Sequence, residues 1–134
     1  MQIPCHWTFQ LARVIFGLYN MRNYIAEIAD IILAIEREMR RSNLWEEESP
    51  SLEDLASQQP FCFDTLVVGQ WLQWVFIPRM KQVVEMGNLP LRSDIYPYLE
   101  ECLEEYKLDS DRLLTLVKDF DELIMAYRTE FTQH

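Results

Sequence analysis

Residues 66–80 have the sequence LVVGQWLQWVFIPRM, and this stretch decides the fold. The run from Leu66 to Ile77 is apolar except for Gln70 and Gln73. It is too short to cross a membrane, which takes about 20 nearly uninterrupted apolar residues. A helix that is apolar around its whole circumference belongs in the interior of a domain. We therefore expect a buried central helix here.

Pro78 lies at the end of this run, where its ring removes a backbone donor and clashes with the preceding turn. We expect the helix to be capped by Asp64 or the residue before it, to kink at Pro78 and to continue to about Met86. Gly87 and Asn88 are then expected to end it.

A second strong pattern lies near the N-terminus, where apolar residues follow one another at alternating steps of four and three. They are Trp7, Leu11, Val14, Leu18, Met21, Ile25, Ile28, Ile32, Ile35 and Met39. This spacing predicts an amphipathic helix, and from Met21 onward its opposite face is charged. The cationic end of this helix, Arg37 to Arg41, suits the negative C-terminal end of its dipole.

Residues 1–20 keep this spacing but leave almost no polar face, so they need a covering partner. Three interpretations stay open. The segment extends the first helix and pairs with another chain, it forms a mobile apolar tail, or the natural chain starts at Met21 and the segment extends the reading frame upstream. We divide the chain into an N-terminal extension (1–20) and a helical domain (21–134), with self-association through residues 7–39 as one hypothesis.

Two further helices follow in the C-terminal half. We expect caps at Ser93 or Asp94 for the third helix and at Asp109 or Ser110 for the fourth. The residues expected to face inward from the third helix are Leu99, Cys102, Leu103 and Tyr106. Those of the fourth, again at alternating steps of four and three, are Leu113, Val117, Phe120, Ile124, Tyr127 and Phe131. Short links between the last three helices favour antiparallel packing.

Residues 43–63 interrupt these patterns with a long polar connection, in which a short helical turn is expected at Leu52 to Ala56. Loops of this length are usually functional or held by their own apolar anchors. The candidate anchors are Trp45, Leu52, Leu55 and Phe61. The chain as a whole is therefore predicted to be all-α, an antiparallel four-helix bundle with a Pro-kinked central second helix and a long first loop.

The net charge of −10 is unevenly distributed. Residues 1–45 hold five arginines and four acids (net +1), whereas residues 46–134 hold seven basic residues and eighteen acids (net −11). Affinity for nucleic acid comes largely from basic residues that neutralise phosphates, so this balance argues against direct binding of nucleic acid and of anionic membranes. It favours a basic partner protein, although acidity that merely maintains solubility is the alternative.

The reactive side chains argue against an enzyme. Cys5, Cys62 and Cys102 are odd in number and far apart with no secretory signal before them, so we expect reduced thiols and a cytoplasmic protein. The only histidines, His6 and His134, are near the ends, which leaves a Ser or Cys nucleophile without a well-placed base. Glu-x-x-His pairs, Cys/His clusters and Gly-rich phosphate loops are absent from the sequence, so we expect no metal and no cofactor.

Large aromatic side chains beside amide and guanidinium groups are typical of protein–protein hot spots. Trp71 and Trp74 are three residues apart and are expected to share a helix face, with Gln70 and Gln73 on an adjoining stripe. The alternative is that the tryptophans fill the core and the glutamines bind loop backbone. The candidate interaction surface consists of Gln58, Pro60, Phe61, Asp64, Gln70, Trp71, Gln73, Trp74, Pro78 and Arg79.

The stretch from Gln59 to Met80, together with Leu89-Pro90 and the Pro97-Tyr98 pair, resembles the YqcC-like family of small bacterial proteins over about residues 21–127. The resemblance implies a single four-helix bundle of unassigned function. It also implies an accessory role in tRNA modification, because members of that family often occur beside a tRNA pseudouridine synthase of the RluA-like kind.

Three functional hypotheses follow. The first is a non-catalytic module that binds a partner protein. The second is an accessory or regulatory partner of a tRNA-modifying enzyme such as a tRNA pseudouridine synthase, docked through the acidic third and fourth helices. The third is a small enzyme or a small ligand carrier that uses a pocket at the Pro78 kink.

Overall fold

A computed structural model describes the backbone of residues 5–106 and 110–132, and the side chains of residues 20–105 and 110–131. Its elements are α1 (Cys5–Arg41), α2 (Leu52–Leu55), the 3₁₀ turn η1 (Pro60–Cys62), α3 (Val68–Trp71), the π-helical turn η2 (Leu72–Phe76), α4 (Ile77–Met86), α5 (Ile95–Tyr106) and α6 (Asp111–Thr132). The described backbone contains helices and no strand, so the all-α prediction is confirmed.

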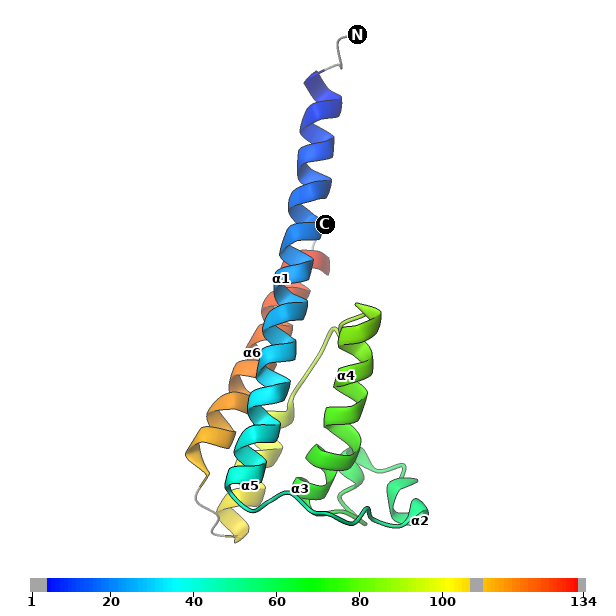
Figure 1. Ribbon diagram of the computed structural model, residues 1–134, viewed down its shortest axis with the longest axis vertical. Helices are drawn as coiled ribbons and strands as arrows, with labels where there is room; N and C mark the ends of the chain where they lie inside the picture. Colours follow the sequence, from blue (N-terminus) through cyan, green and yellow to red (C-terminus); the bar gives the residue numbers. More distant parts are fainter. Residues whose placement is uncertain (1–4, 107–109, 133–134) are drawn as a thin grey trace.

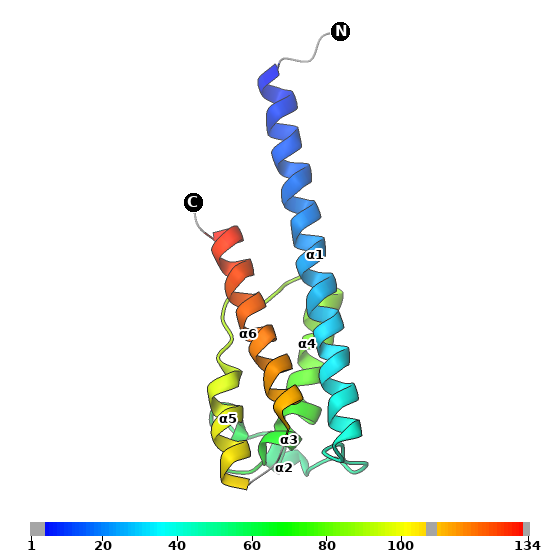
Figure 2. The ribbon, with the colours of Figure 1, turned by 90° about the vertical axis from the view of Figure 1, so that its left-hand side faces the viewer.

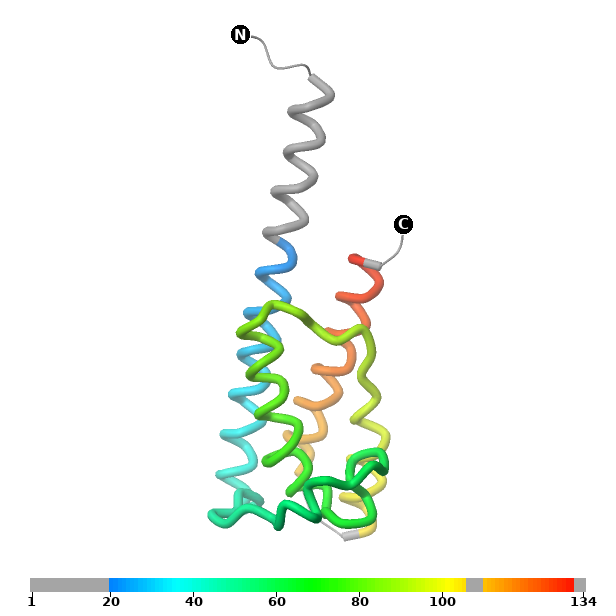
Figure 3. Tube along the Cα trace, turned by 90° about the vertical axis from the view of Figure 1, so that its right-hand side faces the viewer, coloured from blue at the N-terminus to red at the C-terminus, as the bar shows by residue number. Residues whose placement is uncertain are grey.

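The helices α1, α4, α5 and α6 lie side by side and alternate in direction along the chain (Figure 1). α1 packs against α6 and α4, and α5 packs against α6. Turning the molecule shows α6 between α5 and α1 (Figure 2). The long connection after α1 crosses one end of these helices before the chain enters α3 (Figure 3).

The predicted apolar seams form the core. The buried members on α1 are Ile28, Ile32, Ile35 and Met39, and those on α6 are Leu113, Val117, Phe120, Ile124 and Tyr127. Leu99 and Leu103 of α5 are buried as predicted, and Cys102 is half-buried. The seam residues from Trp7 to Leu18 and Tyr106 lie outside the described side chains. Helical spacing therefore identified the inward faces of α1, α5 and α6 over the described side chains.

The central helix begins later than predicted. Its first residue is Val68, and the backbone N–H of Val67 is capped by the Gln70 side chain, whose Oε1 accepts a hydrogen bond of 3.1 Å. Asp64 does not cap the helix, because its carboxylate accepts a 2.5 Å hydrogen bond from the Ser57 hydroxyl within the loop. Backbone hydrogen bonds to the Cys62 carbonyl close a tight turn first, which delays the start of the helix.

The distortion predicted at Pro78 takes the form of the wide turn η2. The Ile77 N–H donates to the Leu72 carbonyl five residues back, instead of to the carbonyl four residues back. Because Pro78 has no N–H and its ring crowds the preceding turn, a wider turn just before it relieves the clash. The helical path thus continues through Pro78 into α4, which Gly87 ends in the left-handed conformation as predicted.

The N-terminus of α5 is capped from another helix. The carboxylate of Asp121 on α6 accepts hydrogen bonds from the Tyr96 backbone N–H at 2.8 Å and from the Ser93 hydroxyl at 2.5 Å. α5 begins directly after Asp94, and its Tyr96 N–H is satisfied by a carboxylate 25 residues away instead of by the predicted local caps, Ser93 or Asp94. α6 begins at Asp111, directly after Ser110.

Candidate functional site

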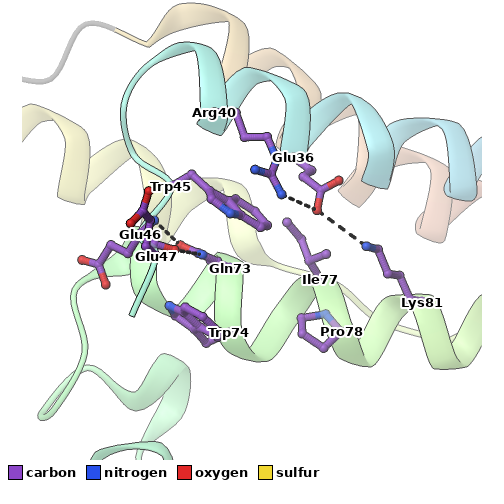
Figure 4. Close-up of a pocket in the computed structure, with 10 residues that line it drawn as sticks. All are labelled: Glu36, Arg40, Trp45, Glu46, Glu47, Gln73, Trp74, Ile77, Pro78 and Lys81. Carbon is purple, nitrogen blue, oxygen red and sulfur yellow. Dashed lines mark hydrogen bonds and ion pairs between the residues drawn. The ribbon is translucent and has the colours of Figure 1, made fainter. Parts of the chain in front are cut away.

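A groove of about 700 Å³ lies between α1, the loop after it and the helical segment η2–α4 (Figure 4). Its lining comes from three parts of the chain and consists of Glu36, Arg40, Trp45, Glu46, Glu47, Gln73, Trp74, Ile77, Pro78 and Lys81. Three of these residues, Gln73, Trp74 and Pro78, belong to the candidate surface predicted from the sequence.

Gln73 fixes the loop side of the groove. Its Oε1 accepts a hydrogen bond from the Glu46 backbone N–H at 2.8 Å, and its Nε2 donates to the Glu46 carbonyl at 2.6 Å. The side chain is only 3% exposed, so both bonds are shielded from water. Gln73 therefore binds loop backbone, and the groove owes its shape on this side to that pairing.

One end of the groove carries basic groups. The Glu36 carboxylate lies 3.8 Å from the Arg40 guanidinium and 3.6 Å from the Lys81 ammonium, which links α1 to α4. The Arg40 guanidinium also lies over the Trp45 ring at 4.2 Å from its centroid, a cation–π contact that holds the loop against α1. Two cations share one carboxylate here, so this end is locally positive.

The other end of the groove is acidic. The Glu46 carboxylate accepts a 3.3 Å hydrogen bond from the Gln70 amide. Glu47 is exposed and forms no ion pair with any described residue, and Glu48 continues the acidic run beside it. The groove is therefore polarised, with unpaired carboxylates at the loop end and the Arg40–Lys81 cluster at the other.

Between these ends lie Trp45 and Trp74, which are half-buried, and Ile77, which is only 2% exposed. Figure 4 shows Trp45 and Trp74 on either side of Gln73, with Ile77 and Pro78 further along the same helix. The Trp74 Nε1 atom is buried, and none of the described residues accepts a hydrogen bond from it. A buried donor without an acceptor costs about 1–3 kcal/mol, so this N–H lowers the stability of the fold locally.

Trp71 does not share this face, so the predicted pairing of the two tryptophans is wrong. Trp71 lines a separate cavity of about 240 Å³ together with Phe61 and Arg79. Its ring contacts Phe61 edge to face at 4.9 Å between centroids. The reason is η2, because the wider turn between the two tryptophans rotates Trp74 away from the direction that regular α-helical spacing gives it.

The second cavity is bounded by strained backbone. Phe61 and Cys62 have φ angles of 57° and 48°, values that residues with a Cβ seldom adopt. This conformation lets the Phe61 ring stack on Tyr98 of α5, with 4.3 Å between centroids and 8° between planes. The ring stacking ties the loop to α5 and accounts for Phe61 as an anchor.

The remaining predicted surface residues line neither cavity. Gln58, Pro60 and Asp64 are exposed on the loop, where Gln58 donates to the Ala56 carbonyl at 3.3 Å. Gln70 lies beside the acidic end of the groove. The structure therefore divides the single predicted surface into the groove, the second cavity and an exposed loop.

Sequence reasoning missed Glu36, Arg40 and Lys81 as groove residues. The four-residue spacing of Glu36 and Arg40 is the one signal that could have indicated their ion pair, and nothing local indicates that Lys81 approaches them. Trp45 was predicted as a loop anchor, and its contact with Arg40 agrees with that.

The last turn of α1 carries a buried carboxylate, that of Glu38. Glu38 is 3% exposed and accepts hydrogen bonds from Arg41 and Ser42, with the Arg112 guanidinium of α6 at 3.7 Å. The Arg41 hydrogen bonds hold the pKa of Glu38 below its ordinary value, and they raise the pKa of Arg41 in turn. This cluster joins α1 to α6 and is structural.

The ionisable side chains that line the groove are Glu36, Arg40, Glu46, Glu47 and Lys81. Its lining contains no Ser, Thr, Cys or His. Over the described residues, no group of His, Cys, Asp and Glu side chains is arranged to hold a metal ion. Within the same part of the chain, none of the helices is both long and apolar enough to span a membrane.

Comparison with known proteins gives a consistent set of relatives. The model of a protein family described as tRNA pseudouridine synthase C matches residues 27–123. An uncharacterised protein of Haemophilus influenzae is 42% identical over 86 residues, covering 63% of this chain and 80% of that protein. The uncharacterised protein YqcC of Escherichia coli is 37% identical over 71 residues, covering 52% of this chain and 65% of that protein.

A further relative is much longer than the matched segment. A protein of Pectobacterium carotovorum subsp. carotovorum named tRNA pseudouridine synthase C is 37% identical over 70 residues, which cover 52% of this chain and only 19% of that protein. No solved structure matches the chain.

Proposed function

Because this chain belongs to the YqcC-like family, we propose that it is a non-catalytic protein-binding module and the accessory partner of a tRNA pseudouridine synthase. The groove lining contains no Ser, Thr, Cys or His, and this is the observation that supports the non-catalytic part of the proposal. The same proposal places the protein in the cytoplasm, where its tRNA-modifying partner works.

One observation carries the choice of partner. The segment of the Pectobacterium protein that is similar to this chain makes up 19% of a protein named for the synthase. Four-fifths of that protein therefore lies outside the similarity and has room for the catalytic apparatus. Physical linkage raises the effective concentration of two modules, so a domain of this kind within a protein named for the synthase suggests that the two work side by side.

The charge of the chain agrees with this role. A net charge of −10 disfavours direct contact with tRNA phosphates, whereas it favours a partner whose surface is basic because it binds tRNA. The exposed carboxylates of α5, at Glu100, Glu101, Glu104 and Glu105, extend the acidic surface of the chain. In this proposal the module contacts the enzyme and leaves the RNA to it.

The test is a titration of the full chain with the tRNA pseudouridine synthase C of the same organism, followed by isothermal titration calorimetry and sedimentation. We expect a stoichiometric complex whose affinity falls as salt rises from about 50 to 300 mM, because exposed charges are screened over about 8–10 Å near physiological salt. The chain alone should not retard tRNA in a gel. Absence of a complex at low salt with both proteins folded would refute the proposed partner.

A further inference from the structure

α1 is longer than the two helices that pack against it. The Glu130 carboxylate, near the end of α6, accepts a 2.7 Å hydrogen bond from the Asn20 side chain. At the end of α4, a Cβ placed on Gly87 would lie 3.8 Å from the Ile25 side chain. Both neighbours therefore end at about this level of α1, and Figures 1 and 2 show α1 continuing beyond them. We call residues 5–19 of α1 the projecting segment.

The projecting segment repeats the apolar spacing that is buried inside the bundle. Further along α1, Ile28 and Ile32 occupy this register and are at most 2% exposed. The same register places one apolar stripe on the projecting segment, formed by Trp7, Leu11, Val14 and Leu18. The opposite face alternates phenylalanine with polar residues, in the order Phe9, Arg13, Phe16 and Asn20. Of these two faces, the stripe alone is uninterrupted, so it is the face that a neighbour would cover.

A helix without neighbours gains little stability. Isolated helices shorter than about 12–15 residues are marginal in water, and most helical stability in proteins comes from the packing of an apolar face. The projecting segment spans about 22 Å at a rise of about 1.5 Å per residue. Its cover must therefore be an apolar element of similar length, which the described residues of the bundle do not supply.

A second copy of the same segment has this length and this spacing. In an antiparallel pair about a two-fold axis, the two halves of the stripe face each other, with Trp7 opposite Leu18 and Leu11 opposite Val14. Each layer then combines a larger with a smaller residue, whereas a parallel pair would place Trp7 on Trp7 and Val14 on Val14. The overlap runs from residue 5 to residue 20, so each segment ends where the bundle of the other copy begins.

The charge of the chain selects the antiparallel arrangement. Residues 46–134 carry a net charge of −11, whereas the projecting segment contains Arg13 and no acid. A parallel pair would bring the two acidic bundles side by side. An antiparallel pair separates them by the length of the segment, about 22 Å, which is more than twice the screening length of about 8 Å at physiological salt. The same net charge disfavours an anionic lipid surface as the cover.

The contact area is sufficient for a weak dimer. A tryptophan side chain buries about 150–250 Å² and an aliphatic one roughly half of that, so the stripe residues of both copies together bury about 1,000 Å². Specific interfaces begin at about this size. We therefore expect a dissociation constant in the micromolar range, because association also costs translational and rotational freedom.

We propose that two copies of this chain associate through their projecting segments, which pair antiparallel along the stripe of Trp7, Leu11, Val14 and Leu18. Each bundle then lies at one end of an elongated dimer, and its groove stays available to another protein. The inference is independent of the proposed function, because it uses a part of α1 outside the groove.

The first experiment measures the mass of the full chain by sedimentation equilibrium from about 1 to 200 µM, the range in which a micromolar dimer dissociates. We expect the mass to rise from 16.1 kDa towards twice that value. Leu11→Glu and Val14→Glu each place a carboxylate in the two central layers and should weaken the dimer at least about 100-fold, because two-fold symmetry counts the loss twice. Phe16→Glu is the matched control, since it adds the same charge to the opposite face, and should weaken the dimer less than about 3-fold.

Two further measurements complete the test. Circular dichroism and urea unfolding at the lowest concentration establish that each variant keeps the folded bundle, and if Leu11→Glu does not fold, the Val14→Glu result decides. Small-angle X-ray scattering of the wild-type dimer distinguishes the two orientations. The antiparallel dimer should give a distance distribution with two maxima, one from within each bundle and one from between the bundles, whereas a parallel dimer gives one.

The inference is overturned if the wild-type chain stays monomeric at the highest concentration, if Phe16→Glu dissociates the dimer as much as Leu11→Glu, or if the scattering shows the bundles side by side. A monomeric chain that binds vesicles of phosphatidylcholine and phosphatidylserine would also overturn it, with a lipid surface as the cover. An antiparallel dimer that binds no synthase would support the inference and refute only the proposed partner.

Discussion

The side-chain amide of Gln73 pairs with both main-chain polar groups of Glu46, a residue 27 positions earlier. The amide oxygen accepts from the main-chain N–H and the amide nitrogen donates to the main-chain carbonyl, so one side chain satisfies both polar groups of the loop residue. The pairing sets the distance between the acidic loop and the helix that carries Trp74. The groove therefore depends on it.

Replacement of Gln73 by methionine should lower the free energy of unfolding by about 1–3 kcal/mol, because both Glu46 groups lose their buried partner. Urea unfolding followed by circular dichroism measures the change. Gln70→Met is the control, since Gln70 is less buried and its contacts lie at the groove edge, and we expect a smaller loss. Equal losses for both variants would contradict a special role for Gln73.

The cap that Asp121 gives to α5 should be worth about 1–2 kcal/mol of stability, because it satisfies an N-terminal N–H with a charged acceptor. Asp121→Ala is the test, with Asp119→Ala as the control, since Asp119 is exposed on the same helix. Hydrogen exchange should also show faster exchange at Tyr96. A loss no larger than that of the control would show that α5 does not depend on this cap.

The contact between α1 and the end of α6 should be visible in a high-pH titration. The Tyr24 hydroxyl donates a 2.7 Å hydrogen bond to the Glu130 carboxylate, which with burial raises the pKa of Tyr24 to about 12. Since the ordinary tyrosine pKa is about 10, the unfolded chain loses this proton first. Stability from this group is therefore complete below pH 10 and is lost as the pH rises towards 12.

Glu130→Gln removes the carboxylate, so the pKa of Tyr24 should move towards its ordinary value and part of the stability loss in this pH range should disappear. Absorbance of tyrosinate against pH measures the first effect, and urea unfolding at each pH measures the second. Glu122→Gln, an exposed acid earlier on α6, is the control. An identical titration for Glu130→Gln and wild type would disprove the hydrogen bond in solution.

The Glu38 cluster should govern behaviour in acid. Because the hydrogen bonds from Arg41 lower the pKa of Glu38, the stability it contributes is complete above the ordinary glutamate pKa and is lost as the pH falls through the lowered value. Glu38→Gln should flatten the acid side of the stability curve and lower stability at neutral pH. Unfolding midpoints between about pH 2 and 7 provide the measurement, with Glu36→Gln as the partly exposed comparison.

Periodicity predicted the core well, and the physical reason is simple. Burial on one face repeats with the helix turn, so the alternating steps of α1 and α6 record which side faces the neighbours. Ile28 and Ile124, both fully buried, were placed by spacing alone. The spacing of apolar residues along one helix is a local pattern, so it can be read from a single sequence.

The features that were missed depend on contacts between distant residues. The cap from Asp121 and the approach of Lys81 to Glu36 connect elements far apart in the chain, and no local spacing records them. The position of Trp74 was missed for another reason, since the regular helical rule was applied across η2 where the turn is wider. Pro78 signalled a distortion there, but not its form.

Because of the wide turn η2, the continuous helical segment from α3 to α4 packs against different neighbours along its length. Ahead of η2, Val68 and Trp71 line cavities shared with α5 and α6, whereas Trp74 within η2 and Lys81 beyond it line the groove beside α1. One residue more or fewer in Leu72–Phe76 would rotate the second half relative to the first. The length of this five-residue segment thus fixes the direction in which the residues after it point relative to those before it.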